Sequence, residues 1–218
     1  MIRLSFFFIL FTSFVFSQKK EAFVGKLVYS VQITDTAFQK FIPATQMVVY
    51  TNDTITRIEN VTDQLGKQAI IKHMELNKSY LLLETPIDNF AIQTDHTDSL
   101  FRKKESKYTF EKKWFKKKVG GVRANRLLVS HPDFKEPKEY LYLKKYSPKY
   151  INTFEDFPGL PVHYYIITMD GVYEYKLISI EEMLPPKDLF GVPSNYKRVT
   201  FNEFLDIMLQ LQGGGEGE

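Results

Sequence analysis

The side chains in this sequence with the greatest chemical potential are four histidines and the carboxylates near them. The histidines are His73, His96, His131 and His163, and none has a second histidine within four positions. His96 lies between Asp95 and Asp98, and a carboxylate–imidazole group of this kind could bind a metal or act in acid–base catalysis. Without a second histidine nearby, a surface loop is the favoured interpretation, and no metal site is predicted.

Local signatures of catalysis are missing from the sequence. It contains no Gly-x-Ser-x-Gly, no His-Glu-x-x-His and no phosphate-binding loop. Adjacent carboxylates occur at Glu155-Asp156 and Glu181-Glu182, but neighbours in a strand point to opposite faces and do not converge. The absence of cysteine excludes thiol catalysis, Cys-zinc sites and iron–sulfur clusters. We therefore predict that the protein is not an enzyme and needs no cofactor; a hydrolase with a dispersed site is the weaker alternative.

The strongest charge feature is a basic run at residues 102–118, which holds nine basic and two acidic side chains, a net charge of +7. On a strand, Tyr108, Phe110 and Trp114 would share one face, and Phe115 would point the other way. Such a run suits anionic head groups or an acidic partner. The predicted contacts with an anionic surface are Lys112, Lys113, Trp114, Lys116, Lys117 and Lys118. The alternative is a solvated edge that prevents sheet-to-sheet aggregation.

The first residues predict export. Arg3 precedes an apolar run at residues 4–16, and Val15 and Ser17 resemble a small-x-small cleavage site, so residues 1–17 are predicted to be a signal peptide. An uncleaved N-terminal anchor is the alternative, although the run is shorter than the roughly 20 residues of a spanning helix. A periplasmic location follows from this prediction, and it argues against nucleic acid as a partner of the basic run.

Most of the remaining chain alternates apolar and polar residues, as half-buried strands do. Residues 23–34 predict a strand with Phe23, Leu27, Tyr29, Val31 and Ile33 on its buried face. Hairpins are predicted at 45–62, 67–86, 107–131 and 161–184, a short strand at 138–146, and irregular structure or a poorly paired stretch at 86–107. Residues 18–212 are thus expected to form a single β-rich domain of eight to eleven strands, followed by a disordered tail at 213–218.

The period changes near the C-terminus. Apolar residues fall at helical spacing at Phe201, Phe204, Leu205, Met208 and Leu211. Thr200 and Glu203 have the spacing of a capping box, and Gly213 is a stop signal. These residues predict a C-terminal α-helix, while the loop before it is expected to place Phe190 in the core.

The segment Pro158-Gly159-Leu160-Pro161 predicts a rigid corner, because each proline fixes its own φ and cannot donate a ladder hydrogen bond. The chain is rich in aromatic residues, with 19 Phe and 13 Tyr. A curved sheet either fills its hollow with such side chains or leaves the hollow for an apolar ligand. If the hollow is open, we expect Phe157, Leu160, Tyr165 and Ile167 at its rim.

Four short motifs, in order, resemble the GLPGLI family of exported proteins of Gram-negative bacteria. They are GKLVYSV at 25–31, GGVRANRLLV at 120–129, FPGLP at 157–161, and Phe190, Pro193 and Tyr196. The resemblance implies a fold like that of the lipoprotein carriers LolA and LolB: mainly β, with a curved antiparallel sheet forming a half-barrel, here with a C-terminal α-helix. It implies little chemistry.

Two functions are compatible with these observations. The first is a non-catalytic periplasmic envelope protein that binds an apolar or lipid-like ligand in the curved sheet, with the basic run on an anionic membrane surface. The second is a structural accessory subunit of an outer-membrane protein complex, with the hollow filled by side chains or by the C-terminal helix.

Overall fold

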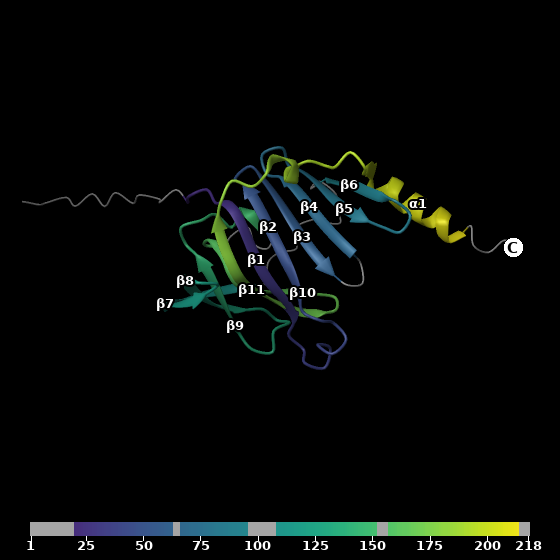
Figure 1. The fold of residues 1–218 in the computed structure, drawn as a ribbon. Coiled ribbons are helices and arrows are strands. Elements are labelled where there is room, and N and C mark those ends of the chain that lie inside the picture. Colours follow the sequence, from purple (N-terminus) through teal and green to yellow (C-terminus); the bar gives the residue numbers. More distant parts are fainter. Residues whose placement is uncertain (1–19, 63–65, 96–107, 152–156, 214–218) are drawn as a thin grey trace, which may run out of the picture.

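The computed structural model describes residues 20–62, 66–95, 108–151 and 157–213. Within these residues, twelve strands form one open sheet in the order β12-β6-β5-β4-β3-β2-β1-β11-β10-β9-β8-β7 (Figure 1). The strands are β1 (Val24–Ile33), β2 (Thr45–Asn52), β3 (Ile55–Thr62), β4 (Gly66–His73), β5 (Lys78–Glu84), β6 (Asn89–Asp95), β7 (Thr109–Val119), β8 (Val122–Ser130), β9 (Lys138–Leu143), β10 (Leu160–Thr168), β11 (Gly171–Glu182) and β12 (Lys197–Thr200). The predicted fold class, a mainly β chain with a curved sheet and a C-terminal helix, is confirmed.

The first strand shows how the sequence pattern becomes a sheet. Alternate residues of β1 are buried, and they are the apolar ones that the pattern predicts. β1 lies at the centre of the sheet, between β2 and β11, so strands from the two ends of the chain meet on it. Asp53 and Asn77 adopt positive φ angles of 79° and 50° in the turns that the sequence predicts, because short polar side chains tolerate this conformation.

The half of the sheet from β1 through β11, β10, β9 and β8 to β7 curls back on itself around the larger core. The β7–β8 turn returns to β11, where a Cβ added at Gly120 would lie 2.8 Å from the Leu177 side chain. Aromatic side chains fill the inside of this curl: Tyr29 and Tyr164 are fully buried, and the Tyr164 ring stacks on Tyr175 at 4.8 Å. This half of the sheet therefore holds a packed core.

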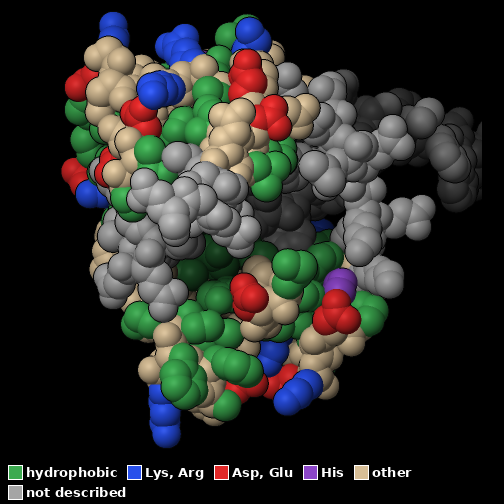
Figure 2. Space-filling view, turned by 90° about the vertical axis from the view of Figure 1, so that its right-hand side faces the viewer, with side chains coloured by type: hydrophobic (Ala, Val, Ile, Leu, Met, Phe, Trp, Pro, Cys, Tyr) green, Lys and Arg blue, Asp and Glu red, His purple; other side chains and the backbone are tan. Residues whose placement is uncertain are grey.

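The other half, β3 to β6, is covered on one face by the segment before β12. Val192 and Tyr196 pack against a small cluster of Ala69, Ile71, Leu82 and Ala91. The guanidinium of Arg57 donates a hydrogen bond of 3.1 Å to the Leu189 carbonyl, which ties this segment to β3. Phe190 is buried, as predicted. On the side of the molecule that faces right in Figure 1, hydrophobic side chains gather around a hollow in the surface (Figure 2).

The C-terminal helix α1 (Phe201–Gly213) lies beside the β6–β12 edge and extends away from the sheet (Figure 1). The predicted capping box is present: the Glu203 carboxylate accepts from the Thr200 backbone N–H at 2.7 Å, and the Thr200 hydroxyl accepts from the Glu203 N–H at 3.2 Å. Phe204 packs edge-to-face on Phe90 of β6 at 5.3 Å. The helix therefore does not fill the curl of the sheet. In the part of the chain described, no helix is long and apolar enough to cross a membrane.

Three expectations about the sheet need correction. Residues 89–95 form β6 instead of irregular structure; Phe90, Ala91 and Ile92 are buried in succession, so the alternation that marks the other strands is missing. The described strands number twelve, more than the eight to eleven expected. One pair, β12 with β6, is parallel, so the sheet is not purely antiparallel. The predicted signal peptide at 1–17, His96 and residues 214–218 of the predicted tail lie outside the described residues.

Candidate functional site

The proline-glycine corner leads directly into a strand. Leu160 pairs with Leu143 of β9, and Pro161 with Tyr142, before a bulge shifts the register of β10. A Cβ on Gly159 would lie 2.3 Å from the Leu143 carbonyl oxygen. Glycine is required here by the close approach of two backbones, and not by the unusual backbone conformation that a tight corner suggests.

The four residues expected at a cavity rim divide into two groups. Phe157 and Leu160 are 1% and 0% exposed and belong to the large core cluster, so they do not line an open rim. Burial follows from packing, because Phe157 contacts the rings of Tyr140 and Tyr142. Tyr165 and Ile167 are half-buried against the same cluster. Ligand binding by these four residues stays a prediction.

A polar group lies beside Tyr165 on the β10–β11 hairpin. The His163 Nε2 lies 2.6 Å from the Glu174 carboxylate, which also accepts a 3.2 Å hydrogen bond from the Tyr165 hydroxyl. The hydrogen bond to His163 holds the pKa of Glu174 below its usual value. Among the residues described, no group of three or more His, Asp or Glu side chains is arranged to hold a metal ion.

The described part of the basic run forms β7, which is the edge strand of the sheet. Lys113 pairs with Glu111 and Lys117 with Glu139, both at 2.6 Å. Burial alone would raise the pKa of Glu139, but hydrogen bonds from Lys117 and Arg126 lower it. Lys112, Lys116 and Lys118 are exposed and have no ion-pair partner among the described residues. The edge position agrees with the sequence interpretation, whereas contact with an anionic surface stays a prediction.

A bulge interrupts β7 at residues 114–116, which we call the Trp114 bulge. Lys113 pairs with Arg126 and Lys117 with Ala124, so three residues of β7 lie opposite Asn125 alone. The bulge breaks the alternation that would have placed Trp114 on one face with Tyr108 and Phe110. The rings of Tyr108 and Phe110 stack on each other at 6.5 Å, and Phe110 contacts the buried Phe157. Trp114 and Phe115 instead are 97% and 79% exposed.

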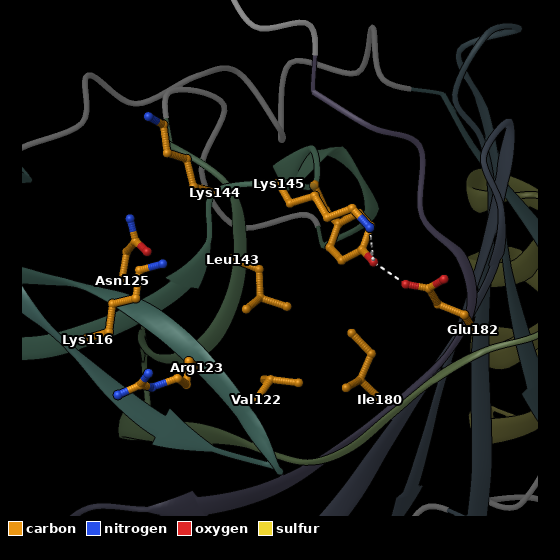
Figure 3. Close-up of a pocket in the computed structure, with 10 residues that line it drawn as sticks. Lys116, Val122, Arg123, Asn125, Leu143, Lys144, Lys145, Ile180 and Glu182 are labelled. Carbon is orange, nitrogen blue, oxygen red and sulfur yellow. Dashed lines mark hydrogen bonds between the residues drawn. The ribbon is translucent and has the colours of Figure 1, made fainter.

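The β7–β8 hairpin also borders a pocket of about 350 Å³, the hairpin pocket (Figure 3). It lies where the ends of β9 and β11 approach the β7–β8 turn. In Figure 3, the side chains of Val122, Leu143 and Ile180 come together from three different strands and form an apolar floor. The remaining lining residues are Lys116, Arg123, Asn125, Lys144, Lys145, Tyr146 and Glu182.

The rim of the hairpin pocket is predominantly basic. Four cations and one carboxylate line it. Lys145 forms an ion pair of 3.0 Å with Glu21, and the Glu182 carboxylate accepts a hydrogen bond from the Tyr146 hydroxyl. Burial, together with this hydrogen bond, raises the pKa of Tyr146, so its hydroxyl stays protonated near neutral pH.

The three other cations are Lys116, Arg123 and Lys144, and in the described part of the chain none has an ion-pair partner. An apolar floor beside positive charge suits an amphipathic anion, because the apolar part of such a ligand would contact the floor and its anionic group would contact the cations.

Sequence reasoning identified only Lys116 of these lining residues. Leu143, Lys144 and Lys145 stand in the predicted strand KEYLYLKKY, where the adjacent lysines were a signal of exposed charge. Ile180 and Val122 looked like ordinary strand residues. Their convergence depends on the curl of the sheet, which brings the β7–β8 turn back to β11.

No protein-family model matches the chain, and no curated protein matches it. Among solved structures, it is similar to a structure of MucB in complex with MucA(peri), with 10% sequence identity and a TM-score of 0.45. The match covers 80% of this chain and 56% of that chain, so the chain spans little more than half the length of the MucB chain it matches.

Proposed function

We propose that the protein is a non-catalytic binding protein of the cell envelope that holds an amphipathic anion in the hairpin pocket. The observation that carries this proposal is the presence of three cations without ion-pair partners among the described residues, Lys116, Arg123 and Lys144, beside an apolar floor. The apolar part of the ligand would rest on Val122, Leu143 and Ile180. Its anionic group would lie among the cations.

The dimensions of the pocket support a small binding site. Its volume of about 350 Å³ is near the lower end of the range for small-molecule sites, roughly 300–1,000 Å³. It would take an anionic head and the first part of an acyl chain. A longer chain would extend out of the pocket along the surface.

The exported location of this function is part of the proposal. It is supported by the predicted signal peptide at 1–17 and by the absence of cysteine, which suits a chain that folds on its core alone in an oxidising compartment. A non-catalytic role is supported by the sequence, which contains neither Gly-x-Ser-x-Gly nor His-Glu-x-x-His.

A fluorescent fatty acid tests the proposal, with the corresponding fatty alcohol as an uncharged probe of the same length. We expect the fatty acid to bind the mature protein in lipid-free buffer and the alcohol to bind more weakly. Replacing Arg123 and Lys144 with Gln should weaken fatty-acid binding about tenfold, since an exposed charge contributes up to about 1 kcal/mol. The matched control replaces Lys78 and Lys187, two exposed lysines elsewhere on the molecule, with Gln and should bind normally. Equal binding of acid and alcohol, or no binding of either, would contradict the proposal.

The accessory-subunit function remains a second candidate because of α1. Phe201, Leu205 and Leu209 are 37%, 41% and 63% exposed, and their spacing of four residues places them on one face of the helix. An apolar stripe of this kind suits a protein partner. Two results together would favour this function. The protein would be retained on an outer-membrane complex and lose that retention when Leu205 and Leu209 are replaced with Ser, and native mass spectrometry would detect no bound ligand.

A further inference from the structure

We propose that the Trp114 bulge docks the protein on an anionic phospholipid bilayer. This inference goes beyond the proposed ligand site, because it concerns a different surface and a different partner. It rests on the shape of the edge strand, on two exposed aromatic rings and on the charges beside them.

The aromatic side chains of the bulge have no structural role within the described fold. Trp114 is 97% exposed and Phe115 is 79% exposed, although both are large and apolar. Tryptophan is favoured where one part of a side chain meets apolar groups and another meets water, which is the situation at a membrane interface. The register shift between Lys113 and Lys117 carries both rings out of the regular strand.

Positive charge surrounds these rings. Lys112, Lys116 and Lys118 are exposed and have no ion pair with any described residue, so their charges are available to a partner. Within β7, five lysines outnumber the single acidic residue, Glu111. A basic surface is attracted to anionic lipids by about 1 kcal/mol for each Lys or Arg near the membrane. Aromatic rings would enter the interface while the lysines contact the head groups.

Protection of the sheet edge does not account for the rings. A bulge and a row of lysines already prevent another strand from pairing with β7. A fully exposed tryptophan adds nothing to that protection and exposes apolar area to water. The combination of the bulge, the lysines and the rings is therefore better explained by docking on a partner surface that contacts all three.

The position of the bulge relates this surface to the ligand site. Lys116 belongs to the Trp114 bulge and also lines the hairpin pocket. If β7 rests on the bilayer, the mouth of the pocket lies at the lipid head groups. A lipid-like anion could then pass between the membrane and the pocket without crossing open water.

The protein contains one tryptophan, so its fluorescence reports on the bulge itself. The experiment adds vesicles of phosphatidylglycerol, or of phosphatidylcholine, to the mature protein isolated from cells that express it. We expect a blue shift of tryptophan emission with phosphatidylglycerol, quenching by lipids brominated on the acyl chain, and no shift with phosphatidylcholine. Inorganic phosphate should cause no shift, which separates a bilayer from a free anion.

Variants measure how much the lysines and the tryptophan contribute to vesicle binding. Replacing Lys112, Lys116 and Lys118 with Gln should weaken vesicle binding about a hundredfold, since about 1 kcal/mol for each lysine is about fivefold. The matched control replaces Lys40, Lys78 and Lys187 with Gln, which changes the net charge equally at exposed positions outside β7. In a sedimentation assay, Trp114→Ala should bind vesicles at least tenfold more weakly, whereas Met169→Ala, which removes another fully exposed apolar side chain, should bind normally.

Three results would overturn the inference. They are unchanged emission on phosphatidylglycerol vesicles, equal losses in the two triple variants, and an equal blue shift with soluble polyglutamate, which would indicate an acidic protein partner. Trp114→Ala should still bind the soluble fatty acid in lipid-free buffer. Unchanged fatty-acid binding when Arg123 and Lys144 are replaced with Gln, together with normal vesicle docking, would contradict the proposed function and leave the docking surface intact.

Discussion

Two buried tyrosines in the curled half of the sheet should respond in opposite ways to loss of their hydroxyl groups. Tyr29 and Tyr164 are both 0% exposed, and their rings meet edge-to-face at 5.9 Å. The Tyr29 hydroxyl donates a 2.8 Å hydrogen bond to the Pro161 carbonyl. Among the described residues, the Tyr164 hydroxyl has no partner. Burial raises the pKa of both side chains, so each stays neutral at any pH where the protein would be measured.

The free-energy changes follow from this difference. In Tyr29→Phe, a hydrogen bond is lost and the Pro161 carbonyl is deprived of its donor, which costs about 1–2 kcal/mol of the free energy of unfolding. In Tyr164→Phe, a buried hydroxyl that has lost its contacts with water is removed while the ring remains. Since an unsatisfied buried polar group costs about 1–3 kcal/mol, this variant should be more stable than the wild type by about 1 kcal/mol.

Urea denaturation of the mature protein and of both variants measures these changes. The two variants should differ by about 2–3 kcal/mol, and their urea midpoints should shift in opposite directions from that of the wild type, a comparison that does not depend on the extrapolation. The double variant should show whether the two sites interact, since the rings are in contact. If Tyr164→Phe destabilises the protein as much as Tyr29→Phe does, the Tyr164 hydroxyl has a partner and our account of this core is wrong.

Two further predictions concern the turn that closes the curl and the polar group on the hairpin. Gly120→Ala should destabilise the protein by about 3 kcal/mol, because the left-handed conformation costs about 1–2 kcal/mol and the new methyl group meets Leu177. Gly121→Ala should cost only the conformational part, since nothing lies within 4 Å of its Cβ. Thermal unfolding measures both losses of stability, and equal losses would refute the contact between residue 120 and Leu177. The pKa of Glu174 is lowered in the folded state, so the contribution of Glu174 to stability is fully present above the ordinary carboxyl pKa of 4.5 and is lost as the pH falls through the lower folded value. His163→Gln should raise the pKa of Glu174 in an NMR titration, and an unchanged pKa would show that His163 does not cause the lowering.

Much of the local structure was predictable from the sequence. The buried residues of β1, the turns at Asp53 and Asn77, and the capping box of α1 all depend on residues within a few positions of one another. Strand β6 was missed for a physical reason: it is covered on both faces, so its apolar residues do not alternate. The Trp114 bulge was missed because a register shift depends on the partner strand, which no local pattern records.

The hairpin pocket shows more clearly where prediction from the sequence ends. Charge, alternation and apolar character are properties of short segments, so three features were predictable from residue types: a mainly β chain, a lysine-rich strand and a buried Phe190. Two features appear only in the folded chain: Lys116, Leu143 and Ile180 line one pocket, and Phe157 and Leu160 are core residues. Both features depend on the curl of the sheet, because strand order and curvature arise from contacts between residues far apart in the chain, such as Gly120 against Leu177.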